Sequence, residues 1–438
     1  MSTTLNLQTF LNERGFSPYQ WMIFICCFLT AFFDGMDTAV IGYVAPHLLQ
    51  DWGLEKAQLS PVLSAALFGL AIGALASGPI ADRFGRKPVL VVAVLLFSLM
   101  CIACAYAQNL SQLEWLRFLT GLGLGAAMPN AITLLSEYCP DDKRSLIVNT
   151  MACGFPLGAA IGGFLAAWLI PTFGWRSVFW VCGGTPLLLA IFMLFTLPRS
   201  VRYLLSHGKP AIEVWKVLRR ISPSLPKETQ FVMIERQIEN MGEKRGIALV
   251  LSRHYLLGSV MLWFAYFFGL IIFYSMVNWL PVLFQEAKMP ETLGPRIVGL
   301  FALGGLGAIF SGWLMDRFNA NKLIAFCAFL TALSVIGIGF ALNYRIEVLV
   351  AVVLIAGVLQ NTMQTSLPAL AAAFYPTAGR TTGVSFMLGV GRFGAIAGTF
   401  LTGWLISQQL SFTHIFMILS IPSLLVMSCI LIKEWFYQ

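Results

Sequence analysis

The stretch Gly78-Pro-Ile-Ala-Asp-Arg-Phe84 recurs as Gly312-Trp-Leu-Met-Asp-Arg-Phe318, with glycine, aspartate, arginine and phenylalanine at the same places. Further matches follow at a nearly constant offset and pair Tyr138, Pro140, Arg144, Met151, Gly158 and Gly162 with Tyr375, Pro376, Arg380, Met387, Gly394 and Gly398. Single matches between apolar segments arise by chance, but a series at one offset does not. The chain therefore consists of two copies of one structural unit.

The composition around these repeats is that of a protein that lies in a membrane. Of the 438 residues, 58% are hydrophobic and 11% are charged, and the mean hydropathy is +0.79. A soluble chain carries about 25% charged residues. Hydropathy predicts spans at residues 19–42, 59–81, 88–107, 112–137, 145–169, 176–197, 256–284, 294–315, 321–342, 347–374, 380–406 and 412–432. We expect an all-α integral membrane protein with twelve transmembrane helices in two six-helix bundles.

An even number of spans in each copy makes both copies run in the same direction through the membrane. Parallel repeats of this kind are typical of transporters built from two bundles. The one long polar stretch between the copies holds eleven Lys or Arg against five Glu. We therefore expect an N-terminal bundle over 1–197, a central loop over 198–255 and a C-terminal bundle over 256–438.

The formal net charge of +8 is explained by short basic loops between the predicted spans. Basic loops stay on the cytoplasmic side, so both termini and the central loop are expected there, in a bacterial inner membrane. No nucleic-acid partner is expected, because the basic residues are not gathered on one face. Met1–Gln20 is polar, so we expect no cleavable signal peptide.

Asp34 and Asp37 lie in the apolar stretch Phe24–Val44. A carboxylate at that depth costs at least about 2.5–3.5 kcal/mol unless it faces a cavity or a partner. The spacing of three residues puts both acids on one face of a helix. The pair predicts a proton or cation site, and the alternative is a structural ion pair with an intramembrane arginine.

The loop Gly78-x-x-x-Asp82-Arg83-x-Gly85-Arg86-Lys87 resembles the signature loop of the major facilitator superfamily. That resemblance implies a cytoplasmic loop whose charges help to lock an outward-open state. The alternative is a charged turn that only follows the distribution of basic loops. The residues expected to act in gating are Gly78, Asp82, Arg83, Gly85, Arg86, Asp316, Arg317 and Arg380.

Arg117, followed by Gly121, Gly123 and Gly125, resembles the second motif of the same superfamily. The glycines allow neighbouring helices to approach closely, and a buried arginine needs an acid to balance it. The alternative is an arginine that reaches the outer surface along its own helix.

A narrower resemblance, to the aromatic acid:proton symporter family, covers nearly the whole chain. It is carried by Asp34-Gly35-Met36-Asp37-Thr38, Leu135-Ser-Glu137-Tyr138 and Gly391-Arg392-Phe393-Gly394-Ala395. The chain is most similar to bacterial carriers of 4-hydroxybenzoate and protocatechuate. The resemblance implies proton-coupled import of a small aromatic carboxylate for aromatic catabolism. The implied proton-coupling residues are Asp34, Asp37, Arg117 and Glu137. One departure is Asn319-Ala320-Asn321-Lys322, where some relatives carry a histidine.

Arg392 is the expected ligand of the substrate carboxylate. It follows the cytoplasmic Arg380 by 12 residues, which places it about 18 Å along the helix and inside the membrane. A guanidinium can form two parallel hydrogen bonds with a carboxylate. The alternative is that Arg392 pairs with Asp34 or with a helix C-terminus and not with a substrate. Further candidates for substrate binding, which could equally bond neighbouring helices, are Gln360, Gln364, Asn130 and Asn278.

Other functions fit the sequence less well. No G-x-x-x-x-G-K-[ST] loop is present to hold a nucleotide. The four histidines are scattered, so we expect no metal, no cofactor and no enzyme active site. The nearer alternative is an exporter of the same fold. Such exporters often have a Gly-Pro dipeptide in the fifth span, whereas in this chain Phe155 separates Gly154 from Pro156. We expect a monomer.

Overall fold

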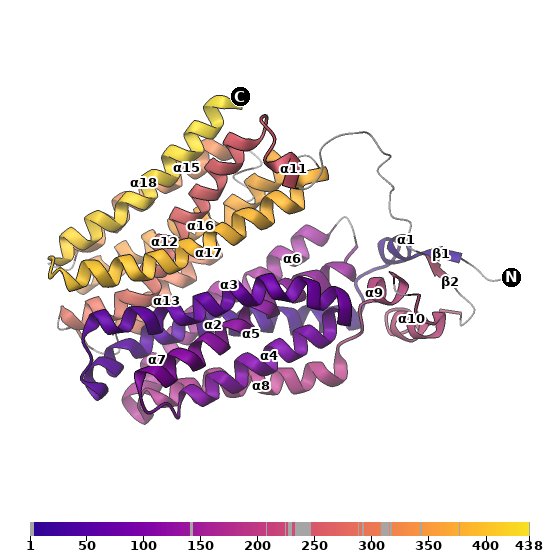
Figure 1. The fold of residues 1–438 in the computed structure, drawn as a ribbon, viewed down its shortest axis with the longest axis horizontal. Coiled ribbons are helices and arrows are strands. Elements are labelled where there is room, and N and C mark those ends of the chain that lie inside the picture. The colour runs from indigo at the N-terminus through magenta and orange to yellow at the C-terminus, as the bar shows by residue number, and fades with distance from the viewer. Residues whose placement is uncertain are drawn as a thin grey trace.

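The computed structural model describes residues 4–140, 143–206, 208–223, 225–226, 230–232, 247–287, 289–290, 293–307, 315, 318–341, 344–375 and 377–437. Within these residues the protein is almost entirely helical (Figure 1). In the part of the chain that the structure describes, eleven helices are long and apolar enough to cross a membrane.

The helices follow the predicted spans closely. The first half holds α2 (Pro18–Trp52), α3 (Leu59–Phe84), α4 (Arg86–Cys104), α5 (Leu110–Glu137), α6 (Arg144–Ala152), α7 (Gly154–Phe173) and α8 (Arg176–Thr196). The second half holds α12 (Leu256–Glu286), α13 (Leu293–Leu303), α15 (Ala320–Ala341), α16 (Ile346–Phe374), α17 (Thr377–Ser407) and α18 (Phe412–Phe436). The predicted span 294–315 begins as α13 and the short helix η2 (Gly304–Gly307). The rest of that span lies largely outside the described residues.

Local sequence signals set where several helices begin and end. Ser17 and Gln20 form a reciprocal cap at the start of α2, with Pro18 at its first position. Gly53 ends that helix in the left-handed region, at φ 59°. The predicted span 145–169 is two helices, α6 and α7, which break at Cys153.

Close helix packing depends on glycines. A Cβ added at Gly121 would strike the backbone of Ala66 on α3, and one at Gly394 would strike the backbone of Phe267 on α12. Small residues permit such approaches between membrane helices. The expected close packing around Gly121 is therefore observed.

The two halves meet from the middle of the molecule to one end. Gly42 of α2 lies against Val277 of α12, and Gly163 of α7 lies against Pro295 of α13. Lys56, in the short helix η1 (Lys56–Gln58), forms an ion pair with Glu286 at the end of α12. Figure 1 shows the two groups of helices diverging toward the opposite end, which carries both chain termini.

The N-terminal segment and the central loop together form a small folded unit, which the sequence did not predict. It consists of β1 (Thr4–Asn6), α1 (Leu7–Asn12), α9 (Val201–Ser206), α10 (Ala211–Leu218) and β2 (Gln230–Val232). The strands β1 and β2 pair in parallel. Phe10 and Phe231 make an edge contact at 5.3 Å in its core. We call this unit the terminal cap. A further short helix, α11 (Ile247–Val250), precedes α12.

Candidate functional site

The first feature of the site is a buried ion pair between α2 and α5. Arg117 Nη1 lies 3.1 Å from Asp37 Oδ1 and 3.0 Å from Oδ2, and Nη2 donates to the Asp37 carbonyl at 3.2 Å. Neither side chain has exposed surface. The predicted balance of Arg117 by an acid is therefore observed.

Asp34 has a different environment from Asp37, although only three residues separate them. Its Oδ1 accepts a hydrogen bond from Thr38 Oγ1 at 3.4 Å, and the residue is 5% exposed. The charges of Arg392 and Asp37 act on it. The acid pair is thus divided, with Asp37 committed to Arg117 and Asp34 within range of the second half.

Arg392 lies near the middle of α17 and is partly buried. Its charge acts on two tyrosines of α12, Tyr266 and Tyr274. The tyrosines are eight residues apart and therefore share one helix face. Arg392 thus lies within range of groups on α12 and α2, and its role as a substrate ligand stays a prediction.

Aromatic rings from both halves meet beside these charges. Phe155 of α7 and Phe273 of α12 have centroids 6.4 Å apart, and Phe273 contacts Tyr274 at 5.3 Å and Phe301 at 6.1 Å. A Cβ added at Gly35, the residue after Asp34, would strike the backbone of Phe155. The sequence analysis missed the roles of Phe155 and Phe273, because aromatic residues are common throughout this chain.

Three of the four amides predicted to bind substrate lie in the second half, and each uses its NH₂ group within the protein. Gln360 donates to the Gly269 carbonyl at 2.7 Å, Gln364 to the Tyr266 carbonyl at 3.5 Å, and Asn278 to Thr399 Oγ1 at 3.0 Å. Their side-chain oxygens are buried without a hydrogen-bond partner among the described residues. Unsatisfied buried acceptors of this kind would accept a bond from a hydroxyl donor.

Two other predicted residues lie far from the ion pair along α5. Asn130 is 13 residues from Arg117, or about 20 Å along the helix, and it donates to the Ala126 carbonyl at 2.8 Å. Glu137 is 20 residues from Arg117, or about 30 Å. The structure does not bring either residue to Asp34, and their predicted roles in binding and coupling stay predictions.

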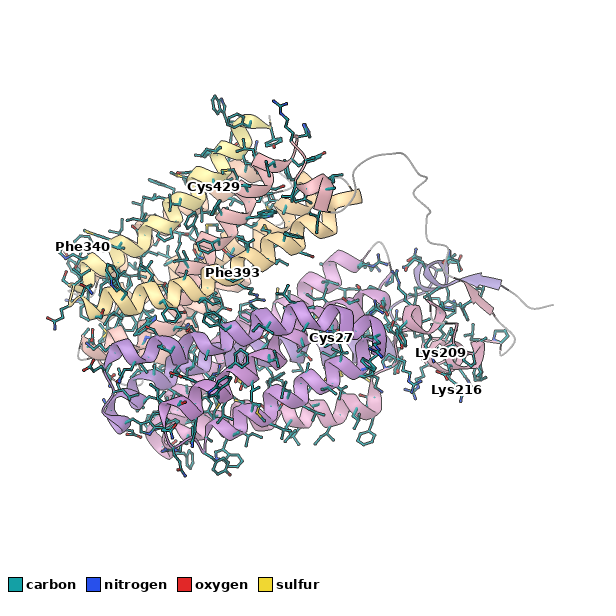
Figure 2. All side chains as sticks on the ribbon, viewed as in Figure 1. Cys27, Lys209, Lys216, Phe340, Phe393 and Cys429 are labelled. Carbon is teal, nitrogen blue, oxygen red and sulfur yellow. The ribbon has the colours of Figure 1, made fainter. Side chains whose placement is uncertain are left out.

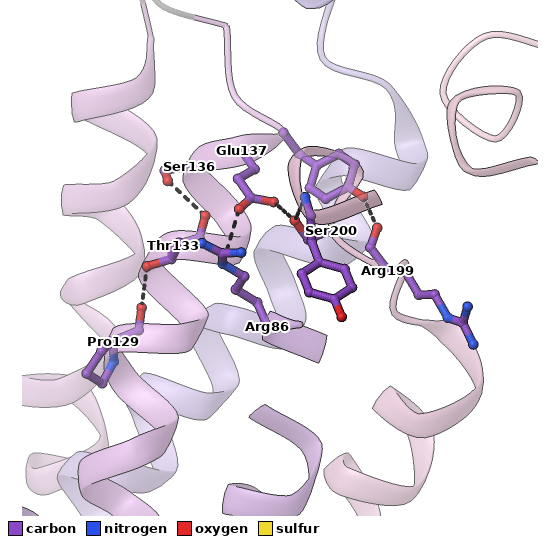
Figure 3. Close-up of polar contacts among 9 residues, drawn as sticks. Arg86, Pro129, Thr133, Ser136, Glu137, Arg199 and Ser200 are labelled. Atoms are coloured by element: carbon purple, nitrogen blue, oxygen red, sulfur yellow. Dashed lines mark hydrogen bonds and ion pairs between the residues drawn. The ribbon is translucent and has the colours of Figure 1, made fainter. Parts of the chain in front are cut away.

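Glu137, the last residue of α5, instead lies beside Arg86 of the signature loop and Ser200 (Figure 3). It accepts a hydrogen bond from Ser200 and lies 3.5 Å from Arg86 Nε. Tyr203 donates to the Arg83 carbonyl at 2.9 Å and packs beside Gly85, whose φ of 91° favours glycine. The signature loop is therefore held by the start of α9. Among the other predicted gating residues, Gly78 faces open space. Asp316 and Arg317 lie outside the described residues, as do the side chains of Asp82 and Arg380.

The fold and site define a membrane carrier in which two helical halves enclose charged residues at their meeting point. The chain matches the family model of the Major Facilitator Superfamily over residues 27–355 and 297–435. It belongs to that superfamily, so the predicted fold class is confirmed.

Two relatives illustrate the match. The chain is 46% identical over 435 residues to the 4-hydroxybenzoate transporter PcaK of Acinetobacter baylyi, with 99% of this chain and 95% of that protein covered. It is 43% identical over 420 residues to the gallate transporter of Pseudomonas putida, with 96% and 93% covered. Both relatives are transporters rather than enzymes, in agreement with the sequence analysis.

Solved structures show the same fold. The D-xylose-proton symporter matches with a TM-score of 0.72 at 16% identity, over 96% of this chain and 98% of that one. The inward open conformation of the xylose transporter XylE from E. coli matches with a TM-score of 0.71 at 17% identity, over 96% of each chain.

Proposed function

We propose that the protein carries a small aromatic carboxylate of the 4-hydroxybenzoate type across the inner membrane, together with protons and in the direction of import, for aromatic catabolism. The observation that supports this most directly is Arg392, a guanidinium near the middle of a membrane helix, within range of Asp34 and two tyrosines. The names of the relatives support the class of substrate.

In this proposal each part of the substrate meets a matching group. Arg392 binds the carboxylate, because an anion that leaves water needs a fixed cation that keeps its charge. Phe155 and Phe273 lie beside the ring, where aromatic contacts favour offset or edge-on geometry. The unpartnered oxygens of Gln360 and Gln364 accept from a ring hydroxyl.

Proton coupling in this proposal comes from competition for Arg392. Asp34 and the substrate carboxylate are both anions that would pair with the same guanidinium. A proton on Asp34 removes one competitor and frees Arg392 for the substrate. Asp37 keeps Arg117 neutralised, which maintains the geometry of α2.

The halves are proposed to be rigid bundles, 1–197 and 256–438, that rock about this site in a monomer. Contacts between them gather at the end away from the termini. If the termini are cytoplasmic, the conformation is closed outside and open inside. The change to an outward-open conformation then requires the contacts around Lys56 and Glu286 to break. At the other end, the signature loop at Arg86 must form contacts that hold the two halves together.

The test is uptake of labelled 4-hydroxybenzoate, benzoate and cyclohexanecarboxylate by proteoliposomes under an imposed pH gradient. We expect accumulation of the two aromatic acids when the outside is acidic. Calorimetry on purified Arg392→Ala should show no binding of either aromatic acid, whereas Arg392→Lys retains weak binding. Binding near that of the unmodified protein in a folded Arg392→Ala variant would contradict the site. Accumulation only under the opposite gradient would indicate an exporter.

A further inference from the structure

A cluster of basic side chains lies where the terminal cap meets the ends of three membrane helices. Lys87 is in the first turn of α4, Arg199 follows α8 by three residues, and Arg220 follows α10 by two residues. The charges of Arg199 and Arg220 both act on the Lys87 ammonium group. Three segments that are distant in sequence thus bring cations together at one rim of the molecule.

Hydrogen bonds fix this rim independently of the charges. Arg220 Nη1 donates to Tyr19 Oη at 3.0 Å, and its guanidinium lies 5.5 Å from the Tyr19 ring centroid. Tyr19 in turn donates to the carbonyl of Thr196, the last residue of α8, at 3.2 Å. The carbonyl of Arg199 accepts from Tyr138 Oη at 2.6 Å. Arg220 is therefore held against the starts and ends of membrane helices and does not extend freely from a loop.

The cluster carries more positive charge than its surroundings neutralise. Glu213 accepts from Arg199 Nη1 at 3.1 Å, and both of these side chains are well exposed. Among the described side chains, one acid thus lies beside three cations, which leaves an excess of positive charge. Grouping like charges has an electrostatic cost, which an anion at this rim would offset.

The adjoining surface is apolar and exposed. On α8, Leu188 is 68% exposed and Phe195 is 76% exposed, and on α4, Val92 is 62% exposed. The helices α4 and α8 pack against each other. A basic rim at the end of an exposed apolar helix surface offers a phosphate contact and an acyl-chain contact side by side, which is the arrangement that suits a phospholipid.

We propose that Lys87, Arg199 and Arg220, with Tyr19, form a binding site for the headgroup of an anionic phospholipid, with the acyl chains along α4 and α8. The site is separate from the proposed transport site, since Lys87 lies in the first turn of α4 whereas Arg392 lies near the middle of α17. A bound lipid would join the terminal cap to the membrane surface of the first half.

Native mass spectrometry of the full-length protein in detergent tests this proposal. The probes are dioleoylphosphatidylglycerol and dioleoylphosphatidylcholine, which share acyl chains and differ in headgroup charge. We expect the first phosphatidylglycerol to bind at least about fivefold more than phosphatidylcholine, a difference of about 1 kcal/mol. The triple variant Lys87→Gln/Arg199→Gln/Arg220→Gln should reduce this ratio to near one.

The matched control removes three exposed charges outside the terminal cap, in Lys143→Gln/Arg253→Gln/Arg345→Gln. Lys209 and Lys216, which Figure 2 labels in the region of the terminal cap, are kept in both triple variants. The control should keep the phosphatidylglycerol preference, as should the charge-retaining variant Arg220→Lys. Single Lys87→Gln and Arg220→Gln variants, each with a smaller expected loss, serve if the triple variant does not fold.

Three results would overturn the proposal. The first is equal binding of the two lipids by the unmodified protein. The second is a loss of the preference in the control triple variant as complete as in the cluster variant, which would indicate general surface charge. The third is displacement of phosphatidylglycerol from the unmodified protein by millimolar inorganic phosphate, which would indicate a soluble anion as the ligand.

Discussion

At the scale of single residues, Asp34 and Asp37 lie three positions apart on one helix but have different partners. Asp37 has no exposed surface and is bound to Arg117. Asp34 accepts a hydrogen bond from the nearby Thr38 and lies within range of the Arg392 charge. Substituting each acid should therefore have different effects on stability and on transport.

We predict that Asp37→Asn destabilises the protein, because it leaves the Arg117 charge buried without a partner. Breaking a buried pair from one side costs about 3–5 kcal/mol. Thermal unfolding in detergent measures the loss, and the double variant Asp37→Asn/Arg117→Gln should recover part of it. A stable single variant would mean that the pair is not the main source of order between α2 and α5.

We predict that Asp34→Asn folds normally but no longer couples uptake to protons. The amide cannot exchange a proton, and it no longer competes with the substrate for Arg392. Accumulation driven by a pH gradient should disappear, while exchange of labelled for unlabelled substrate across the membrane persists. Concentrative uptake by this variant would assign the coupling to another residue.

Phe155 and Phe273 should select for an aromatic ring. An aromatic contact contributes about 0.5–1.5 kcal/mol beyond its buried area, so Phe155→Leu and Phe273→Leu should weaken benzoate binding by up to about tenfold. Binding of cyclohexanecarboxylate should change little. Phe386→Leu is the control, because Phe386 stacks on Trp263 at 5.8 Å. An equal loss of affinity for both acids would show that the two rings contribute only general packing and do not select for an aromatic substrate.

At the scale of secondary structure elements, glycines set how closely α2 and α7 approach. A Cβ at Gly158 would strike the backbone of Phe32, whereas one at Gly184 meets nothing within 4 Å. We predict that Gly158→Ala lowers the free energy of unfolding by about 1–3 kcal/mol, the usual cost of overpacking. Gly184→Ala, measured in the same thermal unfolding assay, should be nearly neutral. Similar values for the two would show that α2 and α7 can separate without cost.

Elements with strong local signals could be predicted from the sequence, and those that depend on distant partners could not. The apolar spans and their repeat follow from hydropathy and spacing alone. The break at Cys153 has a local cause that was overlooked, because Pro156 in the first turn of α7 has no N–H to donate to the Ala152 carbonyl. The pairing of Thr4–Asn6 with Gln230–Val232 joins two segments that each read as polar. The different partners of Asp34 and Asp37 depend on how α5 and α17 pack against α2. The spacing of residues along one helix does not determine that packing.

At the scale of the whole molecule, the ion pair between Lys56 and Glu286 joins the two halves at the end away from the termini. An exposed pair contributes at most about 1 kcal/mol, which corresponds to a severalfold shift between conformations. We predict that Lys56→Glu slows uptake severalfold by repelling Glu286. The exchanged pair Lys56→Glu/Glu286→Lys should restore the rate. A double variant as slow as the single one would show that the two charges act separately.

The parallel pairing of β1 with β2 has a consequence for how the protein is made. Thr4–Asn6 leaves the ribosome first, yet its partner Gln230–Val232 emerges only after the first six predicted spans have been synthesised. The strand must therefore wait unpaired throughout insertion of the first half. Nascent chains arrested before residue 230 should expose Thr4–Asn6 to a protease, and longer chains should protect it. Closure of the β1–β2 pair would then mark the moment at which the first half has reached its correct topology.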